Sequence, residues 1–218
     1  KILFFKDHLS NLLKSLKKYK INKRFIKSNI LQILNKNLSK KKNYNHLLRI
    51  ALNKNTISIS LRKRLTPKLN FNLKLVNLKR ERPQFKNLKY KKILSHLSKM
   101  DNTKSDIGLV FNKKLFETGT SNLLFVRNDK IFTPKKDYYE GITYKYFKSK
   151  VKKIYKKEIF VKELKKFDEI LLIGSGKGVT SVKTISQIGW KRKNLKHYNI
   201  FLSYYRLAIR NSNLYGFN

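Results

Sequence analysis

The chain has 218 residues, and 53 Lys and Arg against 12 Asp and Glu give a formal net charge of +41 at pH 7. Apolar residues make up 40% of the sequence, enough for a hydrophobic core, which argues against a wholly disordered chain. The lack of Cys excludes disulfide bonds and thiolate metal sites. No apolar run reaches the roughly 18 residues that a membrane helix needs.

The positive charge has two possible explanations. A strongly basic protein attracts phosphate backbones and other anionic surfaces at low salt. However, the basic residues are spread evenly, and Lys, Asn and Ile are abundant in every segment, as expected of an AT-rich genome. We therefore favour compositional drift over a nucleic-acid role.

The N-terminal part is predicted to contain two helices followed by three strands. Apolar residues recur at helical spacing over residues 8–20 and 25–38. Alternating apolar and polar residues then predict strands over 46–52, 56–65 and 70–78.

Residues 79–87, which include Pro83, are predicted to connect two lobes. We place a small α/β lobe at residues 1–82 and a larger, strand-rich lobe at residues 83–218. The elements expected in the larger lobe are a helix at 88–99, strands at 107–112, 122–127 and 130–133, a helix from Gly141 to about Ile154, short segments at 158–161 and 169–174, a Gly-rich turn at 174–178 and a helix at about 195–210.

Residues 116–143 carry the most informative pattern. Glu117 is followed by a polar turn, an apolar stretch that begins at Asn122, and then Thr133-Pro134 and Gly141-Ile142-Thr143. This order resembles the class-IV aminotransferases, the pyridoxal-phosphate (PLP) enzymes that include branched-chain aminotransferase, D-amino-acid aminotransferase and aminodeoxychorismate lyase. The resemblance implies a two-lobed α+β fold and a PLP-dependent lyase or aminotransferase.

PLP chemistry needs a lysine for the Schiff base, an acid or base at the pyridine nitrogen, and a phosphate site. The segment Lys86-Asn87-Leu88-Lys89-Tyr90 resembles the family's Lys-x-Leu-Asn-Tyr-like segment, with Lys89 in place of the Asn. The resemblance assigns to Lys86 the Schiff base and the proton transfer at the substrate α-carbon. It assigns to Tyr90 a contact with the cofactor's phenolic oxygen.

Glu117 is the implied partner of the pyridine nitrogen, because a carboxylate there keeps that nitrogen protonated. The implied phosphate site consists of the Ile142 amide and the Thr143 hydroxyl at a helix start, with Ser175 in the Gly-rich turn. One departure concerns the phosphate: Asn11 stands where the family has an Arg. Asn cannot replace a bidentate guanidinium contact, so we expect weaker affinity for PLP.

No metal site is expected. The histidines are scattered at His8, His46, His96 and His197, without the His-Glu-x-x-His spacing of a zinc site. Among RNA- and DNA-binding modules, no RRM, KH or helix-turn-helix pattern organises the aromatic residues.

Three functions remain open at this stage. Aminodeoxychorismate lyase, which forms 4-aminobenzoate and pyruvate in the folate pathway, is favoured because the chain is short and residues 174–176 lack the branched-chain-type Gly-Thr-Ala turn. The alternatives are a branched-chain or D-amino-acid aminotransferase and, from another class, an inactive basic relative bound to nucleic acid or the ribosome. We expect a cytoplasmic homodimer that acts on a small molecule, aminodeoxychorismate or an amino acid, without membrane association. Because the chain begins at Lys1, we also expect an N-terminal segment to be missing.

Overall fold

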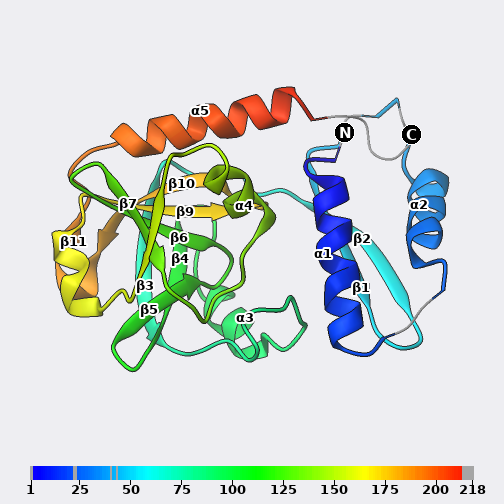
Figure 1. The fold of residues 1–218 in the computed structure, drawn as a ribbon, viewed down its shortest axis with the longest axis horizontal. Coiled ribbons are helices and arrows are strands. Elements are labelled where there is room, and N and C mark those ends of the chain that lie inside the picture. The colour runs from blue at the N-terminus through cyan, green and yellow to red at the C-terminus, as the bar shows by residue number, and fades with distance from the viewer. Residues whose placement is uncertain (1, 22–23, 40, 43, 213–218) are drawn as a thin grey trace. The chain divides into compact units, whose positions relative to one another are not determined.

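The computed structural model describes residues 2–21, 24–39, 41–42 and 44–212 of the chain (Figure 1). Contacts between Cα atoms divide the chain into two compact units: residues 1–64 with 212–218, and residues 65–211. Helices and strands occur in both units, as an α+β fold requires.

The smaller unit packs two amphipathic helices and a β-hairpin around one apolar cluster. Its elements are α1 (Phe5–Lys18), α2 (Ile26–Asn37), β1 (His46–Leu52) and β2 (Ile57–Lys63). The buried helical residues recur every four or seven positions, so they form one stripe along each helix. They are Phe5, Leu9, Leu16, Ile26, Ile30 and Leu34. The hairpin pairs His46 with Lys63 and Leu52 with Ile57, and its turn is closed by the Asn53 side chain, which accepts hydrogen bonds from two backbone amides.

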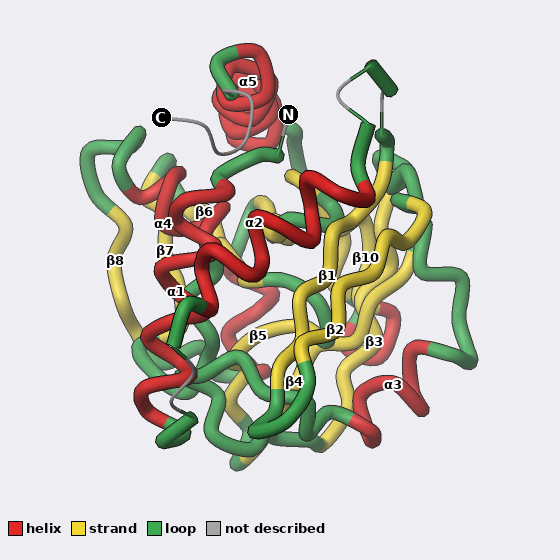
Figure 2. The backbone as a smooth tube through the Cα atoms, turned by 90° about the vertical axis from the view of Figure 1, so that its right-hand side faces the viewer, coloured by secondary structure: helices red, strands yellow, loops and turns green. Residues whose placement is uncertain are grey.

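The larger unit is built on a mixed sheet that, within the described residues, contains nine strands. Its order is β5-β4-β3-β10-β9-β6-β7-β8, with β11 paired to β10; Figure 2 shows β3 beside β10. The pairs β3–β4, β3–β10 and β7–β8 are parallel, and the others are antiparallel. The strands are β3 (Asn70–Asn77), β4 (Ser105–Phe111), β5 (Lys114–Thr118), β6 (Asn122–Arg127), β7 (Lys130–Pro134), β8 (Ile154–Lys157), β9 (Glu169–Gly174), β10 (Gly178–Ile185) and β11 (Trp190–Lys191).

The unit boundary lies earlier in the chain than the connector at 79–87. β3 pairs with β4 and β10, so it belongs to the sheet of the larger unit. The alternation in β3 identifies a strand, but it contains no information about which other strands it joins. That choice depends on residues far away in the sequence.

Strands β6 and β9 form the centre of the core. Leu123 to Val126 and Ile170 to Ile173 are buried continuously, because these strands are covered on both faces. Phe71, Phe125, Phe167 and Trp190 pack in the same cluster. The site described below lies at the ends of these strands and in the turns that leave them.

The larger unit also contains three helices, α3 (Lys91–Leu97), α4 (Ile142–Lys148) and α5 (Lys196–Arg210), and 3₁₀ turns at Val161–Lys166 and Ser186–Ile188. The Glu169 carboxylate is fully buried and accepts hydrogen bonds from the backbone N–H groups of His197 and Tyr198 at 2.8 and 3.0 Å. A carboxylate in this position satisfies amides that have no partner within the helix. Glu169 therefore fastens the start of α5 to β9.

Most predicted elements agree with the observed ones within a few residues, but the helix after Gly141 is shorter than predicted. α4 ends at Lys148, and residues 154–157 form β8, which pairs in parallel with β7. Val151 and Ile154 fit a helical apolar pattern equally well, so periodicity could not locate the change. Strands β5 and β10 were not predicted at all.

Candidate cofactor site

All of the predicted site residues lie in the larger unit, and Glu117 is central to their arrangement. Glu117 is on β5 with 3% of its surface exposed. Its Oε1 accepts a hydrogen bond from Arg80 Nε at 2.8 Å, and its Oε2 from the backbone N of Tyr139 at 3.4 Å. Burial raises the pKa of the Glu117 carboxyl, while the Arg80 guanidinium and the Tyr139 N–H oppose part of this rise.

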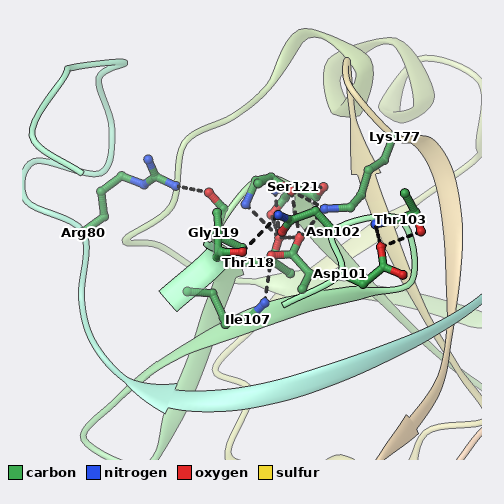
Figure 3. A network of polar contacts seen from close by, with 12 residues as sticks. Arg80, Asp101, Asn102, Thr103, Ile107, Thr118, Gly119, Ser121 and Lys177 are labelled. Atoms are coloured by element: carbon green, nitrogen blue, oxygen red, sulfur yellow. Dashed lines mark hydrogen bonds and ion pairs between the residues drawn. The ribbon is translucent and has the colours of Figure 1, made fainter. Parts of the chain in front are cut away.

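Arg80 is a site residue that the sequence did not reveal. It follows β3 and donates a second hydrogen bond to the Gly119 carbonyl at 3.3 Å, which Figure 3 shows. Its two bonds tie the segment that leads to Lys86 to the end of β5. Nothing in the sequence distinguishes Arg80 from the other basic residues, because its partner Glu117 is 37 positions away.

Lys86 lies in the loop between β3 and α3 and is exposed. Its Nζ is 5.5 Å from the centroid of the Tyr139 ring, a cation–π distance. The backbone N–H of Tyr139 is the group that approaches Glu117. Tyr139 thus contacts both Lys86 and Glu117, and the structure brings these two residues to one region.

Tyr90 is partly buried and stands just before α3. It packs against an apolar cluster formed by Ile93, Leu97, Ile107 and Leu109. Its expected contact with the phenolic oxygen of the cofactor stays a prediction.

Two of the expected phosphate residues meet directly. Thr143, in the first turn of α4, is buried, whereas Ser175, in the turn between β9 and β10, is exposed. Their hydroxyl oxygens are 3.4 Å apart. Ile142, the first residue of α4, is also buried, with 5% of its surface exposed.

The Asn122 side chain connects two parts of the motif, the start of β6 and the backbone just before α4. Its side-chain oxygen accepts a hydrogen bond from Gly141 N at 3.0 Å, and its side-chain nitrogen donates to the Tyr139 carbonyl. A side chain at position 141 would place its Cβ 2.8 Å from that oxygen and would displace the Asn122 amide from its hydrogen bond. Asn122 therefore holds the segment between Tyr139 and Thr143 against the sheet.

These residues fit PLP as a donor set. A buried carboxylate can accept a ring N–H, a lysine amine lies over the ring of Tyr139, and two hydroxyls approach each other at a second point; the cofactor requires these three kinds of group. Asn11, where the family has its phosphate-binding Arg, lies on α1 in the smaller unit. The weaker PLP affinity expected from Asn11 therefore stays a prediction.

Comparison with known proteins gives one family. Residues 1–185 match the family model for amino-transferase class IV. No curated protein matches the chain in sequence. Within the described ranges, no helix has both the length and the apolar character of a membrane span.

Several solved structures share the fold. A Thermotoga maritima protein, provisionally named a branched-chain amino acid aminotransferase, aligns over 97% of this chain and 83% of its own, with 17% identity and a TM-score of 0.78. A Legionella pneumophila protein, provisionally named a 4-amino-4-deoxychorismate lyase, aligns over 94% and 86%, with 16% identity and a TM-score of 0.76. The branched-chain aminotransferase of Thermobaculum terrenum, solved in its PLP form, aligns over 96% and 80%, with 18% identity and a TM-score of 0.70.

Proposed function

The chain belongs to the class-IV aminotransferases and is a PLP-dependent enzyme of that family, and on this basis we propose that it is a 4-amino-4-deoxychorismate lyase. The reaction would release pyruvate and form 4-aminobenzoate, a step toward folate. The observation that carries the cofactor site is the convergence of Glu117, Lys86 and the Thr143–Ser175 hydroxyl pair.

We assign each residue a task from its chemistry. PLP, when bound, supplies an electron sink for the substrate α-carbon. The Glu117 carboxylate, when ionised, would accept a hydrogen bond from the ring N–H and would keep that nitrogen protonated. Burial raises the pKa of Glu117, whereas Arg80 favours its ionised form. Lys86 would hold the cofactor through its side-chain amine and would move the proton at the substrate α-carbon.

The phosphate contacts are assigned to Thr143, Ser175 and the Ile142 amide. Hydroxyl and backbone donors are ordinary ligands of a phosphate, and the two hydroxyls are close enough to share one phosphate group. Tyr90 is proposed to contact the phenolic oxygen. These contacts would orient the cofactor between the turn after β9 and the carboxylate on β5.

Support for the lyase over a transaminase comes from the turn after β9. Residues 174–176 read Gly-Ser-Gly rather than the Gly-Thr-Ala of branched-chain enzymes. Solved structures with both kinds of name share the fold, so the reaction must be tested directly.

The test supplies the purified protein with PLP and 4-amino-4-deoxychorismate and measures 4-aminobenzoate and pyruvate. We expect both products in equal amounts, and no amino transfer from branched-chain or D-amino acids to 2-oxoglutarate. Lys86→Ala should abolish the reaction, whereas Lys92→Ala, an exposed lysine on α3, should not. Amino transfer without pyruvate formation would assign the chain to the transaminases instead.

We further propose a homodimer in the cytoplasm, which light scattering and cell fractionation would examine. The net charge of +41 favours one alternative function, that of an inactive basic relative bound to nucleic acid or the ribosome. A protein that takes up no PLP but binds RNA with steep salt dependence would favour that candidate.

A further inference from the structure

A buried ion pair joins two turns of the candidate site. Asp106, on β4, is fully buried, and its Oδ2 lies 2.7 Å from Lys177 Nζ. The Lys177 side chain has 10% of its surface exposed and also donates to the Thr120 hydroxyl. Its ammonium is 5.3 Å from the centroid of the Phe71 ring. Lys177 thus has several partners in a nearly enclosed place.

Two of the other partners of Asp106 lie in the turn that follows Glu117. Thr118 and Thr120 donate their hydroxyls to Asp106 Oδ2 at 2.9 and 2.7 Å, and the backbone N of Ile107 donates to Oδ1 at 2.8 Å. Figure 3 shows Lys177 reaching the Thr118–Ser121 turn while Arg80 reaches Gly119. Asp106 therefore holds the turn that begins one residue after Glu117.

Lys177 comes from the other turn, two residues after Ser175. The two turns touch at Gly174, where an added Cβ would lie 3.1 Å from the Ser121 hydroxyl and 3.2 Å from the Thr120 carbonyl. Without the Lys177–Asp106 bond, the turn at Thr120 would keep its own partners, but it would lose its ionic link to the turn that carries Ser175.

We propose that Lys177 is a positioning residue of the cofactor site: through Asp106 it sets the separation between the turn beside Glu117 and the turn that carries Ser175. The inference rests on the proposed PLP site. At that site PLP would reach both turns, because Glu117 would hold its ring nitrogen and Ser175 its phosphate. The Lys177–Asp106 ion pair should therefore affect the affinity most for a ligand that contacts both turns.

The same contacts indicate that Lys177 does not bond to the cofactor. Its ammonium is engaged by the buried Asp106 carboxylate and by Thr120, and a nucleophilic amine must be free of such an ion pair. Reduction of the PLP-loaded protein with borohydride, followed by peptide mapping, should place the cofactor on Lys86. Labelling of Lys177 would overturn the inference.

The main test compares two ligands on Lys177→Met. Dissociation constants are measured by titration for PLP and for pyridoxal, which lacks the phosphate. We expect PLP affinity to fall about tenfold or more, the size seen when residues that orient ligand-binding groups are removed, and pyridoxal affinity to change by less than about twofold. A general loosening of the fold would weaken both ligands equally, and this result would overturn the inference, as would unchanged PLP affinity.

Two further variants keep the test decisive. Lys183→Met removes an exposed lysine from the same strand region, β10, and should leave both affinities unchanged. If Lys177→Met fails to fold because Asp106 is left unpaired, the double variant Lys177→Met with Asp106→Asn removes the buried charge as well and should show the same selective loss of PLP affinity. If the unaltered protein binds no PLP, the proposed function itself is overturned, a result distinct from equal loss of both ligands.

Discussion

Glu117 and Asp106 are both buried carboxylates with a basic partner, but the protein's own donors occupy them to different degrees. Asp106 Oδ2 accepts from Thr118, Thr120 and Lys177 at 2.7–2.9 Å, and its Oδ1 from a backbone amide at 2.8 Å. At Glu117 one oxygen is bonded to Arg80 at 2.8 Å, whereas the other meets the Tyr139 amide only at 3.4 Å.

This difference in hydrogen bonding distinguishes a carboxylate that stabilises the fold from one that can bind a ligand. A buried acid whose oxygens are saturated by the protein stabilises the fold, and removing it leaves several donors without partners. A buried acid with a long, weak bond at one oxygen can accept a further donor from a ligand. The pKa of Glu117 is raised because burial removes water from the carboxylate and the protein's own donors replace it only in part.

The largest effect is expected at Asp106. Asp106→Ala would leave the Lys177 ammonium without its buried carboxylate partner and would remove one acceptor of the Thr118 and Thr120 hydroxyls, so we expect a loss of about 3–5 kcal/mol in the free energy of unfolding. Urea denaturation measures this loss. Asp101→Ala, at an exposed acid in the turn before β4, should cost far less stability than Asp106→Ala, and equal losses for the two variants would contradict this prediction.

Glu117→Gln should change the stability little and the rate strongly, in contrast to the large stability loss expected for Asp106→Ala. Its pKa in the folded state is raised, so any stability that protonation contributes is present at low pH and is lost as the pH rises through that pKa. At pH 7 the neutral Gln removes a buried charge, and we expect a stability change within about 1 kcal/mol. The rate should nevertheless fall about a hundredfold, since Gln cannot hold the ring proton. Glu158→Gln, an exposed acid, should leave kcat unchanged.

Arg80→Met should move the pH dependence rather than abolish activity. Arg80 lowers the pKa of Glu117 against the effect of burial, so its removal raises that pKa further. The carboxylate then takes up a proton at a higher pH, and the acid side of the kcat/KM profile should shift to higher pH. Arg82→Met, at a neighbouring exposed position, serves as the control; a downward shift with Arg80→Met would refute this reasoning.

The smallest effect is expected at Glu169, a third buried acid that is part of the scaffold. Glu169→Gln weakens the cap on α5, so we expect a loss of about 1 kcal/mol in stability, measured by thermal unfolding. The kinetic constants should stay as they are, because the groups that contact the Glu169 carboxylate, the amides of His197 and Tyr198 and the His197 ring nitrogen, all belong to α5. Glu81→Gln, at an exposed ion pair, provides the comparison.

Much of the candidate site was predictable because its residues form a compact motif in the sequence. The segment from Glu117 to Thr143 folds into β5, β6, β7 and α4, so residues that follow one another also converge in space. Asn122 shows the physical basis, since its side chain bonds to the backbone just before α4. Arg80 and Lys177 were not predicted. Basic residues are abundant throughout this chain, and the neighbouring sequence does not show which of them pairs with a buried acid.

The sequence by itself determined the local elements: the two amphipathic helices, the β1–β2 hairpin and the apolar strands β6 and β9, whose hydrogen bonds and periodicity lie within short stretches of chain. It also determined the order of Glu117, Asn122 and Thr143. Only the tertiary structure decided that β10 lies between β3 and β9 and that Asp106 pairs with Lys177, 71 positions away. Such pairings depend on long-range packing and on the exclusion of water, and many of the 53 basic residues could have filled either role on composition alone.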